Sequence, residues 1–397
     1  MVIHDVSVVN TVNGTIEPHR DILVRGDRIA AIKPAVRQAH SPVRYAIPGL
    51  WDMHVHLWFA DPQFPQYLAA GVTGLRDMGS DFARVKGWRA QIKGGTLTGP
   101  RIITCGPPLS GPMAEPDPKL PTIIVRDAND GRKAFDTLDD KLNVDFIKVL
   151  SNVPANAFFA VSEYSRHWGH RIVGHLPDEV PARLAADARM GSMEHLFGLA
   201  LACSSREDEL REDRRVALET KDYDALPKIN DQIRDSYDEK KAAQLFEKFR
   251  IYDVMQTPTL TMLKRMTEKD EAAYTRMEHL VRDMNRAGVP ILAGTDTGDP
   301  GTVPGVELHK ELELLVAAGL TPAEALRAAT LTPARLMRKE DTLGAIKPGA
   351  YADVVLLSAN PLTDIRNIRK ISAVMVGGKY VGTKATKSHP RKKRRRR

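Results

Sequence analysis

The sequence has little cysteine and no long apolar run. Only 2 of its 397 residues are cysteine, which is too few for a disulfide framework. No stretch of about eighteen apolar residues occurs, so we expect no transmembrane helix. The first ten residues lack the basic and apolar segments and the cleavage site of a secretory signal. These absences predict a cytoplasmic protein without a membrane partner.

An excess of charge is also absent from most of the chain. The formal net charge is +8, but residues 391–397 carry seven positive charges and leave +1 for the other 390 residues. This balance gives no basis for a specific nucleic-acid partner. We expect residues 385–397 to form a disordered basic tail that could bind polyanions only non-specifically.

Both ends of the chain carry short predicted strands. Val2–Val9 alternates, Asp21–Arg25 follows a turn, and Ala352–Leu357 and Ile371–Val376 are apolar segments between turns. We interpret residues 1–46 and 343–384 as one small β-sandwich domain.

Between the ends, apolar strands alternate with helical segments, a pattern that favours a parallel α/β sheet. The predicted strands number eight and suggest a TIM-like (β/α)₈ barrel over residues 47–342. They are Ile47–Leu57, Val72–Asp77, Arg101–Cys105, Val144–Leu150, Arg171–His175, Gly191–His195, Val254–Leu260 and Val289–Asp296.

The segment 204–250 interrupts this alternation with many charges of both signs. Its apolar spacing, as in Ile229, Ile233 and Tyr237, predicts two amphipathic helices. A lid over the site and a solvated decoration are equally compatible with this pattern. The same two alternatives apply to its arginines, which either bind a substrate carboxylate or are solvated; they are Arg206, Arg211, Arg214 and Arg215.

A pair of histidines in the first predicted strand points to a metal. His54 and His56 are two residues apart, so their side chains lie on the same face of the strand. Neutral imidazoles are typical ligands of zinc. Such a pair is weak evidence alone, because it also occurs in protein cores and loops without any metal.

Further candidate ligands end other strands. His175 ends the fifth, His195 the sixth and Asp296 the eighth predicted strand, and a (β/α)₈ barrel builds its active site at these ends. Four of only 12 histidines share such positions, which favours a metal site.

Lys148 lies within the apolar fourth predicted strand. A lysine there either reaches solvent or pairs with a carboxylate such as Asp145, or it is buried as a neutral amine. A neutral amine can react with carbon dioxide to give a carbamate, whose two oxygens can bridge two metals. The carbamate also balances charge, because two divalent cations among neutral histidines need more anions than Asp296 and a hydroxide supply.

Taken together, these motifs resemble the amidohydrolase superfamily. The resemblance rests on PGLWDMHVH at 48–56, Lys148, His175, His195 and AGTD at 293–296, and it continues through ATLTPAR and PGAYADVV. In detail the sequence is similar to the branch of imidazolonepropionase-related proteins, Xaa-Pro dipeptidases and ochratoxin-type amidohydrolases. The resemblance implies a barrel with a β-sandwich.

The resemblance also implies a site for two divalent metal ions, which we expect to be zinc. His54, His56 and Asp296 would bind one ion, His175 and His195 the other, and carbamylated Lys148 would bridge them. A metal-bridging hydroxide would then cleave an amide or peptide bond of a small substrate, with Asp296 as general base and acid. Lys148 disfavours imidazolonepropionase and deaminase activity, because those relatives lack a bridging lysine.

Two alternatives to amide hydrolysis remain open. A lactonase or esterase would use the same site, and a catalytically silent barrel would serve as a binding module. The complete ligand set disfavours the silent barrel, because a scaffold needs none of these six residues. The sequence assigns no substrate-binding residue and leaves open whether the chain forms a homo-oligomer.

Overall fold

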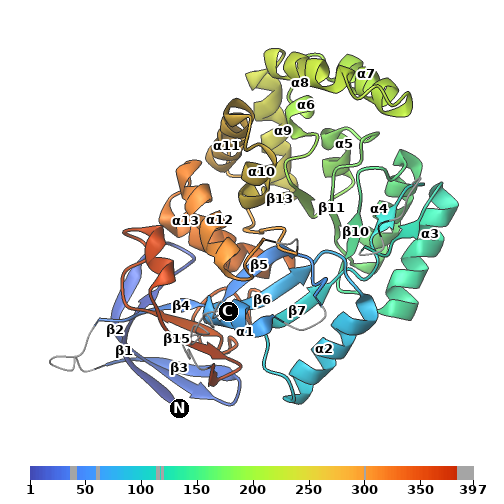
Figure 1. Cartoon of the computed structure of the whole chain (residues 1–397). Helices are drawn as coiled ribbons and strands as arrows, with labels where there is room; N and C mark the ends of the chain where they lie inside the picture. The colour runs from blue at the N-terminus through green and yellow to red at the C-terminus, as the bar shows by residue number, and fades with distance from the viewer. Residues whose placement is uncertain (36–42, 60–62, 113–116, 118–119, 299–300, 382–397) are drawn as a thin grey trace, which may run out of the picture.

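The computed structural model describes residues 1–35, 43–59, 63–112, 117, 120–298 and 301–381. Strands from both ends of the chain form one sheet, and the middle of the chain forms a larger α/β unit beside it (Figure 1). The predicted basic tail, residues 385–397, lies outside the described residues.

The terminal sheet has seven strands, which come from both ends of the chain. In Figure 1 its blue and red strands lie side by side. Their order is β16 (Lys379–Val381), β15 (Ile371–Val376), β14 (Val354–Leu357), β4 (Tyr45–Pro48), β1 (Val2–Val9), β2 (Ile16–Arg25) and β3 (Arg28–Pro34).

This single sheet folds over to enclose a small core of its own. The Ile29 amide donates to the Ala350 carbonyl at 2.9 Å, which brings the β3 end of the sheet to the segment that leads into β14. Ile3, Ile22 and Met375 belong to one buried apolar cluster inside this folded sheet. The terminal strands therefore stabilise one another by apolar burial.

The middle of the chain contains two parallel sheets, as the alternating pattern predicted. One contains β5 (Leu50–Val55), β6 (Val72–Asp77) and β7 (Arg101–Thr104). The other follows the order β13 (Met255–Thr257), β12 (Ser192–Glu194), β11 (Ile172–Gly174), β10 (Ile147–Val149), β8 (Leu109–Ser110) and β9 (Ile123–Ile124).

The first predicted strand, Ile47–Leu57, is divided between two sheets. Its beginning belongs to β4 of the terminal sheet, and Gly49 separates this part from β5. A Cβ atom at Gly49 would lie 2.0 Å from the Thr73 Oγ1, so only glycine fits this close approach.

The prediction of a regular eighth strand at Val289–Asp296 is wrong. One isolated parallel bridge joins Ile291 to Gln256 of β13 and another joins Thr297 to Val55 of β5, so this segment lies between two strands without forming a regular ladder with either. The amides of Thr295 and Asp296 both donate to the His54 carbonyl, at 3.2 and 2.8 Å, as in a bulge. Among the described residues, the regular parallel ladders join the strands into two sheets.

Helices bury apolar faces against these sheets in one large core. Thr321 and Glu324 form a capping box at the start of α13 (Pro322–Ala328). The other helices around the parallel sheets are α1 (Phe64–Ala69), α2 (Phe82–Gly94), α3 (Ala128–Asp136), α4 (Ala155–Trp168), α5 (Ala182–Asp187), α6 (Leu199–Ala202), α10 (Leu260–Met266), α11 (Glu271–Arg286), α12 (Val306–Ala317) and α14 (Leu331–Leu336).

The insertion 204–250 contains three helices where two were predicted. They are α7 (Glu207–Glu219), α8 (Ala225–Asp235) and α9 (Glu239–Tyr252). Leu210 of α7 packs with Ile229 and Ile233 of α8 in a separate small core, whereas α9 joins the main core. Helix α7 was missed because its sequence is largely charged and offers few apolar residues for a periodic pattern.

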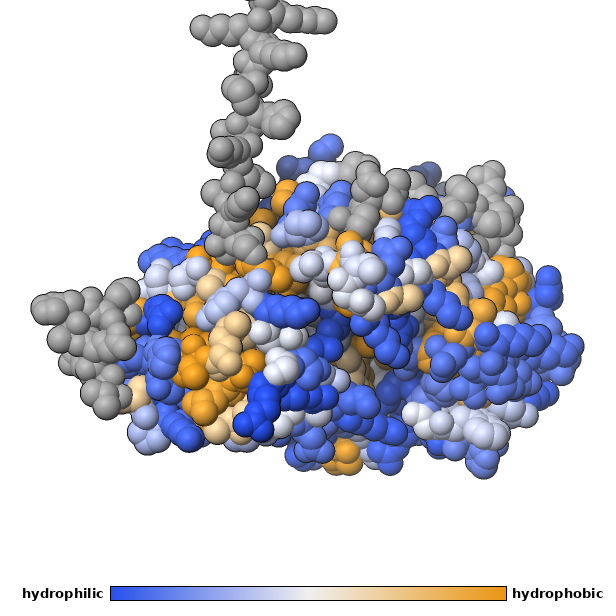
Figure 2. Space-filling view, turned by 90° about the horizontal axis from the view of Figure 1, so that it is seen from below, coloured by the Kyte–Doolittle hydropathy of each residue, from blue (hydrophilic) through white to orange (hydrophobic). Residues whose placement is uncertain are grey.

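The surface in Figure 2 is largely hydrophilic, and its apolar residues lie in several separate patches. None of the helices in the described part of the chain is long and apolar enough to cross a bilayer.

We predict that Gly174→Ala destabilises the fold strongly. Gly174 has φ of 123°, and a Cβ there would lie 2.2 Å from the Val149 carbonyl oxygen, so the backbone of β10 or β11 must shift. Gly169 is the matched control, because its φ is 82° and no atom lies within 4 Å of a Cβ there. Urea denaturation should show a loss of about 1 kcal/mol for Gly169→Ala and a clearly larger loss for Gly174→Ala. Equal losses would contradict this account.

Candidate metal centre

A cavity of about 340 Å³ lies where the parallel strands end. Five of the six predicted ligands line it: His56, Lys148, His175, His195 and Asp296. The sixth, His54, is fully buried beside Asp296. The structure therefore brings together all six residues that the sequence predicted as metal ligands.

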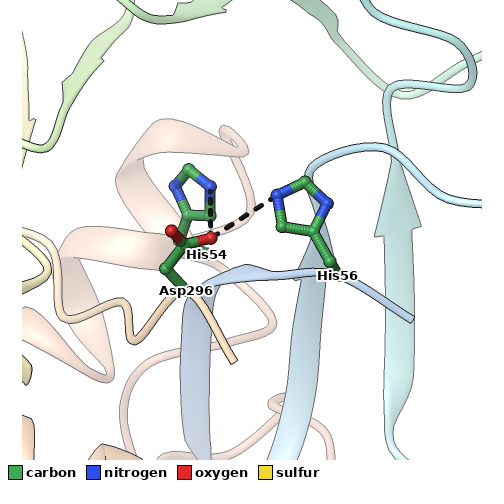
Figure 3. Close-up of side chains that lie close together, drawn as sticks. All are labelled: His54, His56 and Asp296. Carbon is green, nitrogen blue, oxygen red and sulfur yellow. Dashed lines mark ion pairs between the residues drawn. The ribbon is translucent and has the colours of Figure 1, made fainter. Parts of the chain in front are cut away.

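His54, His56 and Asp296 form the tightest group. The Asp296 Oδ1 lies 3.4 Å from the His54 Nε2 and 3.5 Å from the His56 Nε2 (Figure 3). One donor atom from each residue lies within 4.8 Å of the others, so these three residues could hold one metal ion. The His195 ring is 4.5 Å from that of His54, and the His175 ring is 5.1 Å from that of His195, measured between centroids.

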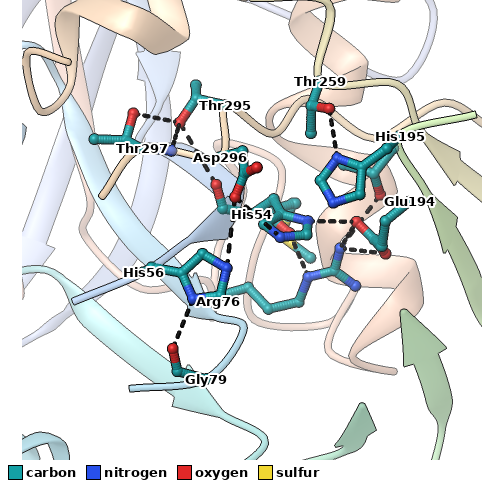
Figure 4. Close-up of polar contacts among 12 residues, drawn as sticks. His54, His56, Arg76, Gly79, Glu194, His195, Thr259, Thr295, Asp296 and Thr297 are labelled. Atoms are coloured by element: carbon teal, nitrogen blue, oxygen red, sulfur yellow. Dashed lines mark hydrogen bonds and ion pairs between the residues drawn. The ribbon is translucent and has the colours of Figure 1, made fainter. Parts of the chain in front are cut away.

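Hydrogen bonds determine which ring nitrogen of His54 and His56 faces the cavity. The His56 Nδ1 lies 2.6 Å from the Gly79 carbonyl oxygen, which can only accept, so Nδ1 carries the hydrogen. The His54 Nδ1 donates to the Glu194 Oε2 at 2.9 Å (Figure 4). In both rings, Nε2 is left with its lone pair towards Asp296.

His195 is oriented in the same way from the other side. Its Nδ1 lies 2.8 Å from the Thr259 Oγ1, and that hydroxyl donates its hydrogen to the Pro258 carbonyl at 2.7 Å. Thr259 must therefore accept from His195, which leaves Nε2 as the lone-pair nitrogen. The His175 Nδ1 is likewise within 3.0 Å of the Ser151 Oγ.

Burial keeps all four histidines neutral. It is the largest cause that lowers the pKa of His54, His56 and His195 well below the usual range, and it lowers the pKa of His175 to about 3. Neutral imidazole is the form that binds metals.

One orphaned atom indicates that the group fits a metal. The His54 Nε2 is buried and has no hydrogen-bond partner among the described residues. Leaving a buried acceptor unsatisfied costs about 1–3 kcal/mol, and a divalent cation at this position would satisfy it. The remaining donors, imidazole nitrogen and carboxylate oxygen, suit zinc.

Asp296 is aimed into the cavity by its backbone. It has φ of 56°, in the left-handed region that costs a non-glycine residue energy. Its neighbour Thr295 donates from Oγ1 to the buried carboxyl of Asp52 at 2.7 Å. Burial raises the pKa of Asp52 to about 8. These contacts tie the irregular eighth segment to β5 beside His54.

Lys148 is almost completely buried in β10, which excludes the solvent-reaching alternative. Burial is the largest cause that lowers the pKa of its amine. Asp145, the alternative partner, pairs instead with Arg89 at 2.7 Å.

Apart from the candidate ligands, the cavity walls are apolar except for one arginine that the sequence analysis missed. Trp58 stacks on His56, and Phe197 contacts His175 and His195. Arg265 of α10 lines the same cavity, together with Met262 and Met266. Its position in the first helix after β13, above a strand end, is the signal that could have identified it.

No described residue of the insertion 204–250 lines this cavity, which does not support a lid in this conformation. Of the arginines considered there, Arg206 pairs with Glu209 and Arg215 pairs with Glu212. Both of these glutamates belong to α7. These pairs favour the solvated alternative.

The structure also shows the partners of two other polar residues, Arg76 and His309. The Arg76 guanidinium pairs with Glu194, which lies 118 residues further along the chain, at 2.9 Å. His309 on α12 is buried and bonds the Ala70 carbonyl at 2.8 Å, so it packs within the fold.

Comparisons with known proteins agree with this arrangement. The sequence model of the Amidohydrolase family matches residues 45–381. An ochratoxinase from Aspergillus niger is 23% identical over 414 residues, covering 90% of this chain and 82% of that protein. Among solved structures, a Xaa-Pro dipeptidase with bound methionine has a TM-score of 0.73 at 20% identity, covering 96% of this chain and 99% of that one. A bottromycin amidohydrolase has a TM-score of 0.74 at 23% identity, covering 96% and 86%.

This chain belongs to the amidohydrolase family, because the match spans most of its length. It is accordingly a hydrolase that acts on carbon–nitrogen bonds. The solved structures share its overall fold.

Proposed function

We propose that this chain is a two-metal hydrolase that cleaves an amide or peptide bond of a small substrate. His54, His56 and Asp296 would hold one divalent ion, and His175 and His195 the second. Lys148, carbamylated, would link the two. The observation that carries the proposal is the common orientation of the histidines, whose Nδ1 atoms are engaged behind the cavity.

We also propose that the two parallel sheets belong to one closed (β/α)₈ barrel. The Asp145 amide donates to the Thr104 carbonyl at 3.0 Å, next to β7 and β10. The amide of Met53 donates to the Ala293 carbonyl at 2.9 Å, and that of Gln256 to the Pro290 carbonyl at 2.9 Å. These contacts support closure at both junctions between the sheets.

When bound, two divalent ions would lower the pKa of water and polarise the scissile carbonyl. Asp296 would accept the proton of the attacking water as its oxygen bonds to the carbonyl carbon. The same carboxyl would return this proton to the leaving nitrogen as the carbon–nitrogen bond breaks. The outer hydrogen bonds of the histidines would keep the imidazoles fixed throughout.

The cavity also suggests a substrate with an apolar part and an anionic group. Trp58 and Phe197 supply apolar walls. Arg265 lies 3.4 Å from Glu307, and that buried carboxylate also accepts from Lys310 at 2.8 Å. Two cations share one carboxylate, so the group keeps a net positive charge. The Arg265 side chain is 44% exposed, which leaves it able to bind a substrate carboxylate.

Asp296→Asn should fold normally and lose turnover by about 10²–10⁴-fold, because an amide cannot carry the proton. The readout is hydrolysis of dipeptides and N-acyl amino acids, with circular dichroism as the test of folding. Asp253→Asn is a matched control, since Asp253 also has φ of 56° but pairs with Arg335 away from the cavity. Full activity in Asp296→Asn would remove Asp296 from this role.

Arg265→Met should raise KM about 10–100-fold for a substrate with a free carboxylate, the effect of one charged hydrogen bond. The same substrate with its carboxylate converted to an amide should show little change. Arg206→Met is the control, because Arg206 is bound to Glu209 on α7. Equal effects of Arg265→Met on the acid and the amide would contradict a carboxylate-binding role.

A further inference from the structure

A buried ion pair lies directly behind the candidate metal centre. Arg76 of β6 and Glu194 of β12 are both completely buried, and the Arg76 Nη2 lies 2.9 Å from each Glu194 carboxylate oxygen. Figure 4 shows the guanidinium below His54 and turned towards Glu194. The cavity lining does not include either residue, so neither is placed to contact substrate.

The pair is fully hydrogen-bonded by its surroundings. Arg76 donates from Nε to the Met53 carbonyl, from Nη1 to the Ser192 Oγ at 2.9 Å and from Nη2 to the Thr257 Oγ1 at 3.2 Å. Ser192 in turn donates to the Glu194 Oε1 at 2.5 Å. The network therefore connects β5, β6, β12 and β13, the strands around His54 and His195.

Fold stability alone gives little reason for such a pair. Removing two charges from water costs several kcal/mol per ion, and well-packed neutral residues often stabilise a core as well or better. The position of the pair suggests another reason. The Glu194 Oε2 accepts from the His54 Nδ1 at 2.9 Å, and the next residue in the chain is His195. One carboxylate is thus bonded to a candidate ligand of one metal and adjacent in sequence to a candidate ligand of the other.

We propose that Arg76 and Glu194 are positioning residues that prepare both halves of the metal centre. This inference rests on the proposed two-metal function. Because Arg76 donates to both oxygens of Glu194, this carboxylate acts as an acceptor and His54 must donate to it from Nδ1. The His54 Nε2 then keeps its lone pair towards the metal. The same network fixes the end of β12 from which His195 extends.

A neutral amide at position 194 would no longer determine which ring nitrogen of His54 carries the hydrogen. The amide of Glu194→Gln can present either its oxygen or its NH₂ group to His54, so it no longer requires the tautomer with a free Nε2. That variant also leaves the Arg76 charge unpaired, which threatens folding. The double variant Arg76→Gln/Glu194→Gln removes both charges and keeps a hydrogen-bonding amide at each position.

The experiment measures the Zn²⁺ dissociation constant of metal-free full-length protein by competition with a chromophoric chelator, together with its melting temperature. We expect both the single and the double variant to bind Zn²⁺ about 10–100-fold more weakly than wild type. The metal-free double variant should melt within a few degrees of metal-free wild type. The control Arg101→Gln/Asp353→Asn removes another largely buried pair, 2.7 Å apart and outside the site, and should leave zinc affinity within about twofold.

The possible results separate this inference from the proposed function. Zinc affinity of the double variant within twofold of wild type would overturn the inference, since the pair would then only support the fold. If only one of the single and double variants folds, that variant decides by the same criterion. Wild-type protein that binds no zinc would overturn the proposed function and this inference with it.

Discussion

The candidate metal centre depends on which nitrogen of each histidine carries the hydrogen. His56 donates to a backbone carbonyl, His54 to the Glu194 carboxylate and His195 to a hydroxyl that is already committed as a donor. Each bond leaves a lone pair on Nε2, and burial keeps the rings neutral. Without these partners, the same residues at the same strand ends would have no fixed ligand geometry.

The fold supplies these partners from separate elements. Gly79 follows β6, Glu194 ends β12 and Thr259 immediately precedes α10. The site also contains strained backbone, because Asp296, His195 and Thr259 all have positive φ. Glu311 of α12 stabilises the start of α10 by accepting from the amides of Leu260 and Thr261, at 2.9 and 2.8 Å. Glu311 thus fixes the start of α10, and the residue before that helix, Thr259, is the hydrogen-bond partner of His195.

Much of this arrangement could be predicted from the sequence, because ligand positions follow strand ends. Hydrophobic pattern and spacing located His54, His175 and His195 without any knowledge of contacts. Pattern could not reveal that Arg76 pairs with Glu194 rather than its neighbour Asp77, since the partner is 118 residues away and is set by strand order. Nor could it foresee that Thr295 and Asp296 interrupt the eighth strand, because that bulge arises from bonds to β5. Arg265 escaped notice because the sequence analysis followed the ends of strands, and Arg265 lies in α10, the helix after β13.

The central claim is a two-metal site that requires Lys148. The most direct test is metal content per chain, with and without added bicarbonate, in wild type and Lys148→Ala. The account predicts about two metal ions per wild-type chain, with occupancy favoured by bicarbonate, and a fall in the variant that bicarbonate does not reverse. One ion per chain in both proteins, indifferent to bicarbonate, would contradict it.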